Sequence, residues 1–260
     1  MQIAARAYIA MIKKVTSQLG ATLPPALDTA FTAASGLREA ADRIEGSAEA
    51  SNFRIIDCLK RGVDWHTDKQ VQALVLDRVV AANGIRVAAD AEAEIMVKTA
   101  LTENADSVVE AWRTVLAPDA AALTVGYEEL RIDDLAGADT LSLTRRNLVN
   151  VWADARTAVE RFHIAIEGWN MLAAGAGVQR VAGCEPLILT DSLTPAEISS
   201  VNKPDAWTLT GLTDQPLQLA TLAEYRQRAS ALQAEYARLR SEQEQRNEQA
   251  LVDSYRLYRR

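Results

Sequence analysis

Apolar side chains recur at alternating spacings of four and three residues through the centre of this 260-residue chain. The series consists of Leu148, Trp152, Ala155, Val159, Phe162, Ile166, Trp169 and Ala173. Such spacing places every member along one side of an α-helix, and it predicts a helix over residues 145–174, about 45 Å long. Heptads serve both helical bundles and coiled coils between chains, but Trp and Phe are large for a seam between two chains and favour an intrachain core.

Glycine and proline divide the first half of the sequence into further stretches of helical spacing. The expected helices span approximately residues 4–19, 27–44, 53–59, 67–82, 91–101 and 106–116. Their expected C-terminal ends are marked by Gly20, Gly46, Gly62, Asn83 with Gly84, and Pro118. Glycine and asparagine tolerate the left-handed conformation that commonly ends helices, and proline removes a backbone donor.

Two regions, residues 121–143 and 178–210, lack a sustained helical period. Within them, the segments LTVGY, TLSLT, PLILT and AWTLTG are expected to form short strands. The segment LTPAE predicts a short helix, because Thr194 and Glu197 are spaced as a capping box around Pro195. The expected fold is therefore mainly α, a multi-helix body with minor β elements.

The stretch after Pro216 contains neither glycine nor proline and predicts a long C-terminal helical arm. It begins with TLAE, a capping box of Thr221 and Glu224. The apolar stripe that follows consists of Leu222, Tyr225, Ala229, Leu232, Tyr236 and Leu239. We expect a single helix that reaches about Tyr258 and spans about 55 Å.

Within this arm, residues 240–249 carry no apolar side chain. A helix that is polar on all sides cannot pack against a body, so this run is expected to bridge solvent. Glu242 with Arg246, like Glu224 with Arg228, has the spacing of a helical ion pair. The predicted domain organisation is a helical body over 1–213, with a sub-boundary near residue 118 as an alternative, and the arm over 214–260.

Charge is distributed unevenly along the chain. The formal total is −7, and residues 221–260 contain eight arginines and six acidic residues, which leaves 20 bases and 29 acids in residues 1–220. The acidic body argues against a wide nucleic-acid-binding surface. Four of the six tyrosines lie in the last 40 residues, and Tyr and Arg commonly anchor protein interfaces. The predicted partner-binding residues are Leu232, Tyr236, Leu239, Leu251, Tyr255, Arg256, Tyr258, Arg259 and Arg260.

The sequence offers few groups for catalysis or metal binding. Glu160 and His163 are spaced as one helical ligand pair, but a di-iron bundle needs a second pair, so His163 is expected to be a partly buried packing residue. The segment DWHTD is expected at a helix N-terminus, where capping and the helix dipole account for Asp64, Thr67 and Asp68. GAGVQR lacks the third glycine of a dinucleotide loop and favours a helix end. We predict no catalytic, cofactor-binding or metal-binding residue.

The cysteine count and the apolar runs bear on the cellular environment. Cys58 and Cys184 are too few for a disulfide framework and indicate reduced thiols. No stretch has the roughly 20 apolar residues of a membrane span, and no targeting segment is recognisable. The expected location is the cytoplasm, or a particle assembled there.

These features favour a non-enzymatic structural protein that forms homo-oligomers or docks on other subunits of an assembly, for example a viral (phage) particle. The acidic segment 128–139 is expected to be a solvated loop or, alternatively, a docking surface for a basic partner. One alternative function is a regulatory or nucleic-acid-associated adaptor, in which the arginines of YRLYRR contact phosphate and its tyrosines stack on bases. A second is a helical enzyme whose site carries no recognisable motif.

Overall fold

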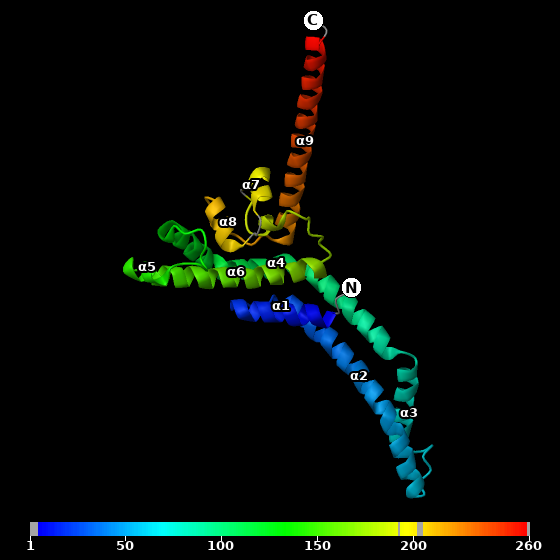
Figure 1. Ribbon diagram of the computed structural model, residues 1–260. Coiled ribbons are helices and arrows are strands. Elements are labelled where there is room, and N and C mark those ends of the chain that lie inside the picture. Colours follow the sequence, from blue (N-terminus) through cyan, green and yellow to red (C-terminus); the bar gives the residue numbers. More distant parts are fainter. Residues whose placement is uncertain (1–4, 192, 202–204, 259–260) are drawn as a thin grey trace. The chain divides into compact units, whose positions relative to one another are not determined.

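The computed structural model describes residues 5–191, 193–201 and 205–258, and the regular elements among them are helices (Figure 1). The α-helices are α1 (Ala5–Leu19), α2 (Pro25–Lys60), α3 (Lys69–Ala82), α4 (Ile85–Leu130), α5 (Thr140–Arg145), α6 (Val149–Gly175), α7 (Pro195–Ser200), α8 (Ala206–Leu212) and α9 (Leu222–Tyr258). A short 3-10 helix, η1 (Glu185–Ile188), follows α6. The mainly α fold is therefore confirmed. No described helix combines the length and the apolar character that a membrane crossing requires.

Contacts within the chain define two compact units. The first consists of Met1–Lys13 and Leu23–Asn104, and the second of Lys14–Thr22 and Ala105–Arg260. Helices α1 and α4 each contribute to both units, whereas α2 and α3 belong to the first and α5 to α9 belong to the second. The division of the sequence into a body (1–213) and an arm (214–260) stays a prediction.

Several predicted helix ends are confirmed by the structure. α1 ends before Gly20 and α3 ends before Asn83 and Gly84, and the two glycines have φ angles of 72° and 77°. Glycine adopts this left-handed conformation with no steric cost, so the chain can leave the helix at these positions. The predicted capping box of Thr194 and Glu197 begins α7.

Two predicted helix ends are wrong, because helices continue through them. α2 runs through Gly46, and Ser51 and Cys58 beyond it are fully buried. This packing outweighs the cost of about 1 kcal/mol for a glycine inside a helix. α4 runs through Pro118. The carbonyl that loses its helical partner to this proline belongs to Thr114, and both residues are exposed, so water can solvate the carbonyl.

The expected β elements are also wrong, since the described residues contain no strand. LTVGY lies inside α4, TLSLT lies in α5, PLILT overlaps η1 and AWTLTG lies in α8. Periodicity does not separate a short buried strand from a short buried helix. The feature that starts α8 is Asp205, whose Oδ1 accepts the N–H of Thr208 at 2.8 Å and caps the helix.

The core of the second unit contains the large aromatic residues of α4 and α6. Trp112, Phe162 and Trp169 are at most 1% exposed. A Cβ atom at Gly168 would lie only 2.6 Å from Cγ1 of Val15 and 2.7 Å from the Trp112 ring, so α6 packs closely at this glycine. Phe162 and Trp169 of the heptad pattern thus lie inside this chain, and Trp152 is half-buried. α6 begins four residues after the predicted start, because α5 occupies the preceding segment.

The first unit contains the antiparallel pair α2 and α3 and the N-terminal part of α4. Its core includes Leu27, Phe31 and Val97, each fully buried. The side chain of Arg38 on α2 is only 8% exposed, and its Nε lies 2.9 Å from Oδ1 of Asp90 on α4. This ion pair offsets part of the cost of burying the guanidinium, whose Nε and Nη1 are buried without a hydrogen-bond partner among the described residues.

α9 is continuous from Leu222 to Tyr258, so the predicted arm helix is confirmed. Its predicted capping box is formed: Oε2 of Glu224 accepts the N–H of Thr221 at 2.8 Å, and Oγ1 of Thr221 accepts the N–H of Glu224 at 3.1 Å. Farther along, Glu242 and Arg246 form the expected ion pair at 3.7 Å. Figure 1 shows α9 extending beyond α7 toward the C-terminus.

Candidate interaction surfaces

The base of α9 is attached to the second unit by hydrogen bonds from several elements. On α6, Nε1 of Trp169 donates to the carbonyl of Ala220 at 2.7 Å. On α4, Oδ1 of Asp106 accepts the N–H of Leu222 at 2.7 Å, which satisfies a donor that has no partner within the helix. Tyr225 is 1% exposed and its ring meets Trp169 edge to face at 4.8 Å. These contacts fix the direction of the first turns of the arm.

Arg113 on α4 is the centre of the polar network beneath this base. Its Nε and Nη2 donate to the carbonyl of Leu219 at 2.9 and 2.7 Å, and Nη2 also pairs with Glu224. Burial opposes the charge of Glu224, but the hydrogen bonds from Thr221 and Arg113 outweigh it and hold the pKa of Glu224 below its ordinary value. The sequence assigned Glu224 to Arg228 instead, and the structure gives it a partner on another helix.

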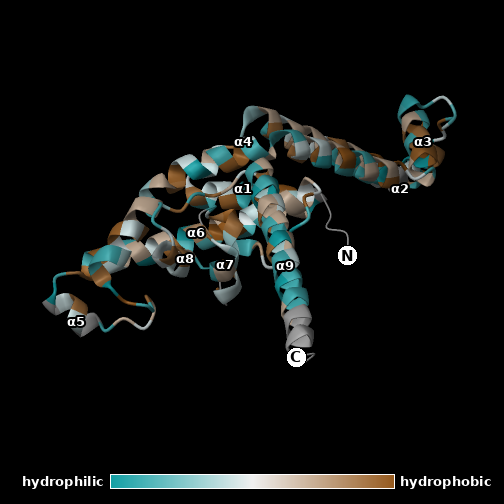
Figure 2. Ribbon diagram, turned by 90° about the horizontal axis from the view of Figure 1, so that it is seen from above, coloured by the Kyte–Doolittle hydropathy of each residue, from teal (hydrophilic) through white to brown (hydrophobic). Residues whose placement is uncertain are grey.

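Side chains along α9 change from buried to exposed within two turns. The stripe members that are 1% to 5% exposed are Leu222, Tyr225, Ala229 and Leu232. Residues 233–250 are exposed, apart from the half-buried Glu242, and Figure 2 shows mostly hydrophilic residues along this part of the helix. Leu232, which the sequence assigned to a partner-binding surface, is packed within this chain, and its role toward a partner stays a prediction.

Tyr236 and Leu239 are the described members of the predicted surface that face solvent, at 36% and 41% exposure. The hydroxyl of Tyr236 donates to the carbonyl of Pro195 at 3.1 Å and lies 3.0 Å from Oγ of Ser199, both on α7. Tyr236 thus ties the arm to α7 at the point where its buried part ends. The rest of its ring and the side chain of Leu239 remain available for contact.

The remaining predicted residues lie at the end of the arm. The backbone of Leu251, Tyr255, Arg256 and Tyr258 is helical, but their side chains lie outside the described part of the structure. Arg259 and Arg260 lie outside the described residues altogether. The role of these six residues stays a prediction.

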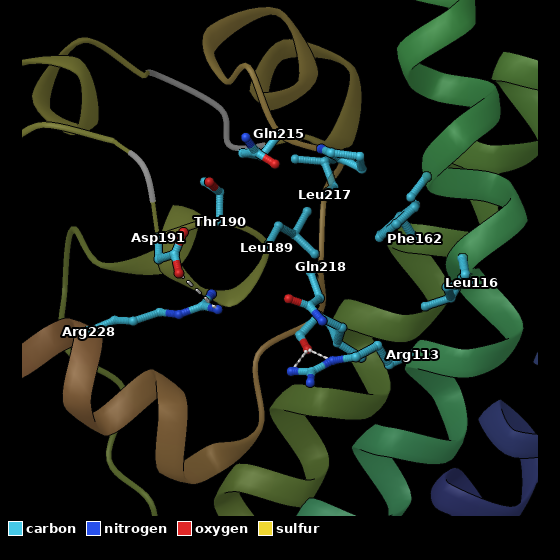
Figure 3. A pocket seen from close by; sticks show the side chains of 14 residues that line it. Arg113, Leu116, Phe162, Leu189, Thr190, Asp191, Gln215, Leu217, Gln218 and Arg228 are labelled. Carbon is cyan, nitrogen blue, oxygen red and sulfur yellow. Dashed lines mark hydrogen bonds and ion pairs between the residues drawn. The ribbon is translucent and has the colours of Figure 1, made fainter.

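A cavity of about 470 Å³ lies next to the base of the arm (Figure 3). Its apolar side is formed by residues such as Leu116 and Phe162, and its polar side by residues such as Thr190 and Gln218. The described lining residues that carry a side-chain hydroxyl or a charge are Thr190, Asp191, Arg113 and Arg228.

The charged groups of this cavity are engaged within the chain. Arg228 is 13% exposed, donates to the carbonyl of Leu187 at 3.1 Å and lies 3.7 Å from the carboxylate of Asp191. Burial lowers the pKa of Arg228, which nevertheless remains a cation at neutral pH. The guanidinium of Arg113 donates to the carbonyl of Leu219, and Figure 3 marks its hydrogen bonds as dashed lines. The charged side chains that line the cavity therefore already have partners, and their hydrogen bonds stabilise the base of α9.

The two residues considered as one helical pair of metal ligands, Glu160 and His163, each lie near another charged side chain. The side chain of His163 is 72% exposed, which corrects its expected role as a packing residue, and its Nε2 lies 3.3 Å from Glu167. Glu160 lies 4.0 Å from Arg156 instead. The described residues contain no group of three or more His, Cys, Asp or Glu side chains arranged to hold a metal ion.

The DWHTD segment forms the cap of α3, and of its three predicted residues Asp68 is the one that caps the helix. Oδ1 of Asp68 accepts the N–H groups of Gln70 and Val71, and this hydrogen bonding, chiefly from Val71, lowers the pKa of Asp68. Sγ of Cys58 lies 3.5 Å from Oδ2 of Asp68, and burial raises the pKa of the Cys58 thiol. Both cysteines are free and buried, as the sequence indicated. A protonated, buried thiol is a poor nucleophile.

The acidic segment 128–139 joins the end of α4 to α5 and is fixed to the second unit by a buried side chain and by hydrogen bonds to its backbone carbonyls. Leu135 is 6% exposed, and the carbonyl of Ile132 accepts a hydrogen bond from Nε1 of Trp207 at 3.2 Å. Its five carboxylates are exposed. Both the solvated loop and the acidic docking surface remain compatible with this arrangement.

Exposed apolar side chains that were not anticipated from the sequence lie on α2 and α3. Four of them are between 49% and 63% exposed: Ile56, Leu59, Leu76 and Val79. The sequence places Ile56 and Leu59 in a helical stripe, and such a stripe ordinarily faces a core. The sequence does not show whether neighbouring helices cover this stripe, and the structure shows that these side chains are exposed.

Comparison with protein families, with curated proteins and with solved structures gives no match for this chain. The exposed outer half of α9 is therefore the basis for inferring what the protein does.

Proposed function

We propose that this chain is a non-enzymatic assembly protein that contacts other protein chains through the exposed half of α9. The observation that carries the proposal is the contrast along this one helix. Its first three turns are held by Trp169, Asp106 and Arg113, whereas residues 233–250 are exposed.

A helix without tertiary contacts contributes little stability of its own, because most helical stability in proteins comes from packing of an apolar face. The 26 residues from Gln233 to Tyr258 extend about 39 Å at 1.5 Å per residue. A rigid base lowers the conformational entropy that is lost when such an arm binds, since its direction is already fixed. Both features suit a spacer that presents its end to another chain.

The partner that we favour is a second copy of this chain, on its own or within a larger assembly such as a viral particle. The arm, residues 221–260, carries two more bases than acids, and residues 1–220 carry nine more acids than bases. Opposite net charges favour the encounter of an arm with the body of another copy. The tyrosines and arginines of the terminal sequence are residue types that anchor interfaces.

Deleting residues 241–260 tests this proposal. We expect the full chain to form an oligomer whose mass, measured by light scattering after size-exclusion chromatography, falls to that of a smaller species on deletion. Gln243→Ala, a substitution inside the solvated run, is the matched control and is expected to leave the mass unchanged. An equal mass for the full chain and the shortened chain over a wide range of concentrations contradicts the proposal.

A further inference from the structure

The cavity beside the base of α9, here called the first cavity, adjoins a second cavity of about 430 Å³. Both cavities belong to the second unit, and they share three lining residues: Asp191, Gln218 and Arg228. Arg228 therefore lies at the boundary between them. Sites for small ligands commonly have volumes of about 300–1,000 Å³ and combine apolar walls with a few polar groups. Both cavities have this size, so their lining residues decide what they accept.

Apolar side chains form one wall of the first cavity. Leu116 on α4, Phe162 on α6 and Leu189, which follows η1, are 1% to 2% exposed (Figure 3). An apolar part of a ligand that lies against these side chains is removed from water, and this removal is the main favourable contribution to such binding. The wall therefore suits the hydrocarbon part of a small molecule.

Arg228 reaches the first cavity from α9, and its charge is incompletely compensated. Its side chain is 13% exposed, and its Nη2 lies 3.7 Å from Oδ2 of Asp191, which is longer than a hydrogen bond of about 2.7–3.2 Å. The side chain of Asp191 is 69% exposed, so solvent weakens this ion pair. Burial lowers the pKa of Arg228 in spite of the carboxylate. A better placed anion would compensate this charge more fully.

The other charged groups that act on Arg228 have opposite signs. Glu224 raises the pKa of Arg228 and Arg113 lowers it, and these two residues form an ion pair with each other. Among the described lining residues, the carboxylate of the first cavity is Asp191, whereas those of the second cavity are Asp191, Glu224 and Glu235. An anion beside Arg228 therefore meets less repulsion in the first cavity than in the second.

We propose that the first cavity binds a small amphipathic anion, a monocarboxylate with an aliphatic chain of about eight carbons. Its carboxylate accepts hydrogen bonds from Nη2 of Arg228, and the exposed side chain of Asp191 turns toward solvent. Its chain lies against Leu116 and Phe162. Hydrogen bonds between a guanidinium and a carboxylate are among the stronger ones in proteins, because both partners are charged.

Three other classes of ligand fit the first cavity less well. A neutral apolar molecule would cover Arg228 without supplying an acceptor, and burying a charge without a partner is unfavourable. A cation would be repelled by the same guanidinium. A dianion such as a phosphate ester needs a second guanidinium, but that of Arg113 is already held by the carbonyl of Leu219 and by Glu224.

The proposal is tested with octanoate, whose binding to the full chain is measured by isothermal titration calorimetry. Octanamide, which has the same carbon chain without the charge, is the matched control. We expect octanoate to bind with a Kd of about 1 mM or below. Octanamide is expected to bind about tenfold more weakly or worse, because it cannot form the charge-assisted hydrogen bonds to Arg228.

Two substitutions of exposed carboxylates locate the bound anion. Asp191→Asn removes the carboxylate that competes for Arg228 in the first cavity and is expected to lower the Kd of octanoate about threefold. Glu235→Gln makes the same change of charge in the second cavity alone and is expected to alter this Kd by less than about twofold. An equal gain of affinity from both substitutions would place the anion in the second cavity and contradict the proposal.

Arg228→Gln tests the guanidinium itself, since it removes the charge and keeps a donor for the carbonyl of Leu187, which Nη1 of Arg228 contacts at 3.1 Å. It is expected to weaken octanoate about tenfold and to leave octanamide unchanged. Equal weakening of the two compounds would mean that Arg228 only maintains the shape of the cavity, and this would overturn its assigned role. Asp191→Asn changes an exposed side chain and keeps the test valid if Arg228→Gln disturbs the base of α9.

Two further results would refute the proposal: equal affinities of octanoate and octanamide, and no binding of octanoate at about 10 mM. The described lining residues of the first cavity end at Arg228, so deletion of residues 241–260 is expected to leave the affinity for octanoate unchanged. This result separates the ligand site from the proposed function of α9, because either can fail without the other.

Discussion

Arg113→Met is the substitution that probes the base of α9 most sharply. It keeps an apolar stem but removes the donors to the carbonyl of Leu219, which is 1% exposed, and to Glu224. A hydrogen bond from a charged group contributes about 1.5–3 kcal/mol, and its loss leaves a buried acceptor unpaired. Glu224 is 39% exposed, so solvent screens its ion pair and its loss adds less than about 1 kcal/mol. We expect the free energy of unfolding of the second unit to fall by about 2–4 kcal/mol.

Urea unfolding followed by tryptophan fluorescence measures this change. Of the five tryptophans, the second unit contains four: Trp112, Trp152, Trp169 and Trp207. The fluorescence therefore reports mainly on the unit that contains Arg113. Arg240→Met, in the exposed run of the same arm, is the matched control and is expected to change the free energy by less than about 0.5 kcal/mol. Equal effects of the two substitutions would refute the role assigned to Arg113.

Three further predictions concern other contacts. Asp90→Ala removes the carboxylate beside the buried Arg38 and is expected to destabilise the first unit by about 1–2 kcal/mol. Urea titrations followed by circular dichroism measure this change. An unchanged free energy of unfolding would show that water solvates the guanidinium. Gly168→Ala forces a Cβ against the Trp112 ring and is expected to lower the free energy of unfolding by about 1–3 kcal/mol, which calorimetry detects as a lower Tm. An unchanged Tm would mean that α6 shifts to make room for the added atom. The folded pKa of Glu224 is lowered, so its stabilisation is present above the unfolded value of about 4.3 and is lost as the pH falls through the lower folded value. Glu224→Gln is therefore expected to flatten the decline of Tm on acidification, and an unaltered decline would contradict this.

The arm could be predicted from the sequence because its signals are local. The capping box of Thr221 and Glu224, the absence of glycine and proline, and the pair of Glu242 with Arg246 all act within one or two helical turns. The same holds for the end of α1 at Gly20, where the backbone conformation itself favours glycine.

Features that depend on distant residues could not be predicted in this way. The strand assigned to AWTLTG failed because burial on several sides removes the periodic signal that separates strands from helices. Pro118 was assigned as a helix end because exposure of the Thr114 carbonyl, which makes the proline tolerable, is a property of the tertiary structure. The pairing of Arg113 with Glu224 joins residues 111 positions apart.

Exposed apolar residues on α9 and α2 show a related limit. Leu232 and Leu239 belong to one apolar stripe with one spacing, yet the first is buried and the second is exposed. Leu59 and Cys58 are neighbours on α2, yet Cys58 is fully buried and Leu59 is 62% exposed. A stripe in the sequence shows that a residue lies on the apolar side of a helix, but the neighbouring helices determine whether that side is covered.

Amide hydrogen exchange along α9, measured at low and high protein concentration, tests the central claim most directly. The account predicts that residues 222–232 are protected at both concentrations, because the base is anchored within the chain. It predicts that residues 233–258 exchange rapidly in dilute solution and gain protection at high concentration, as chains associate through the arm. Protection of residues 233–258 that is the same at both concentrations, whether high or absent, would contradict it.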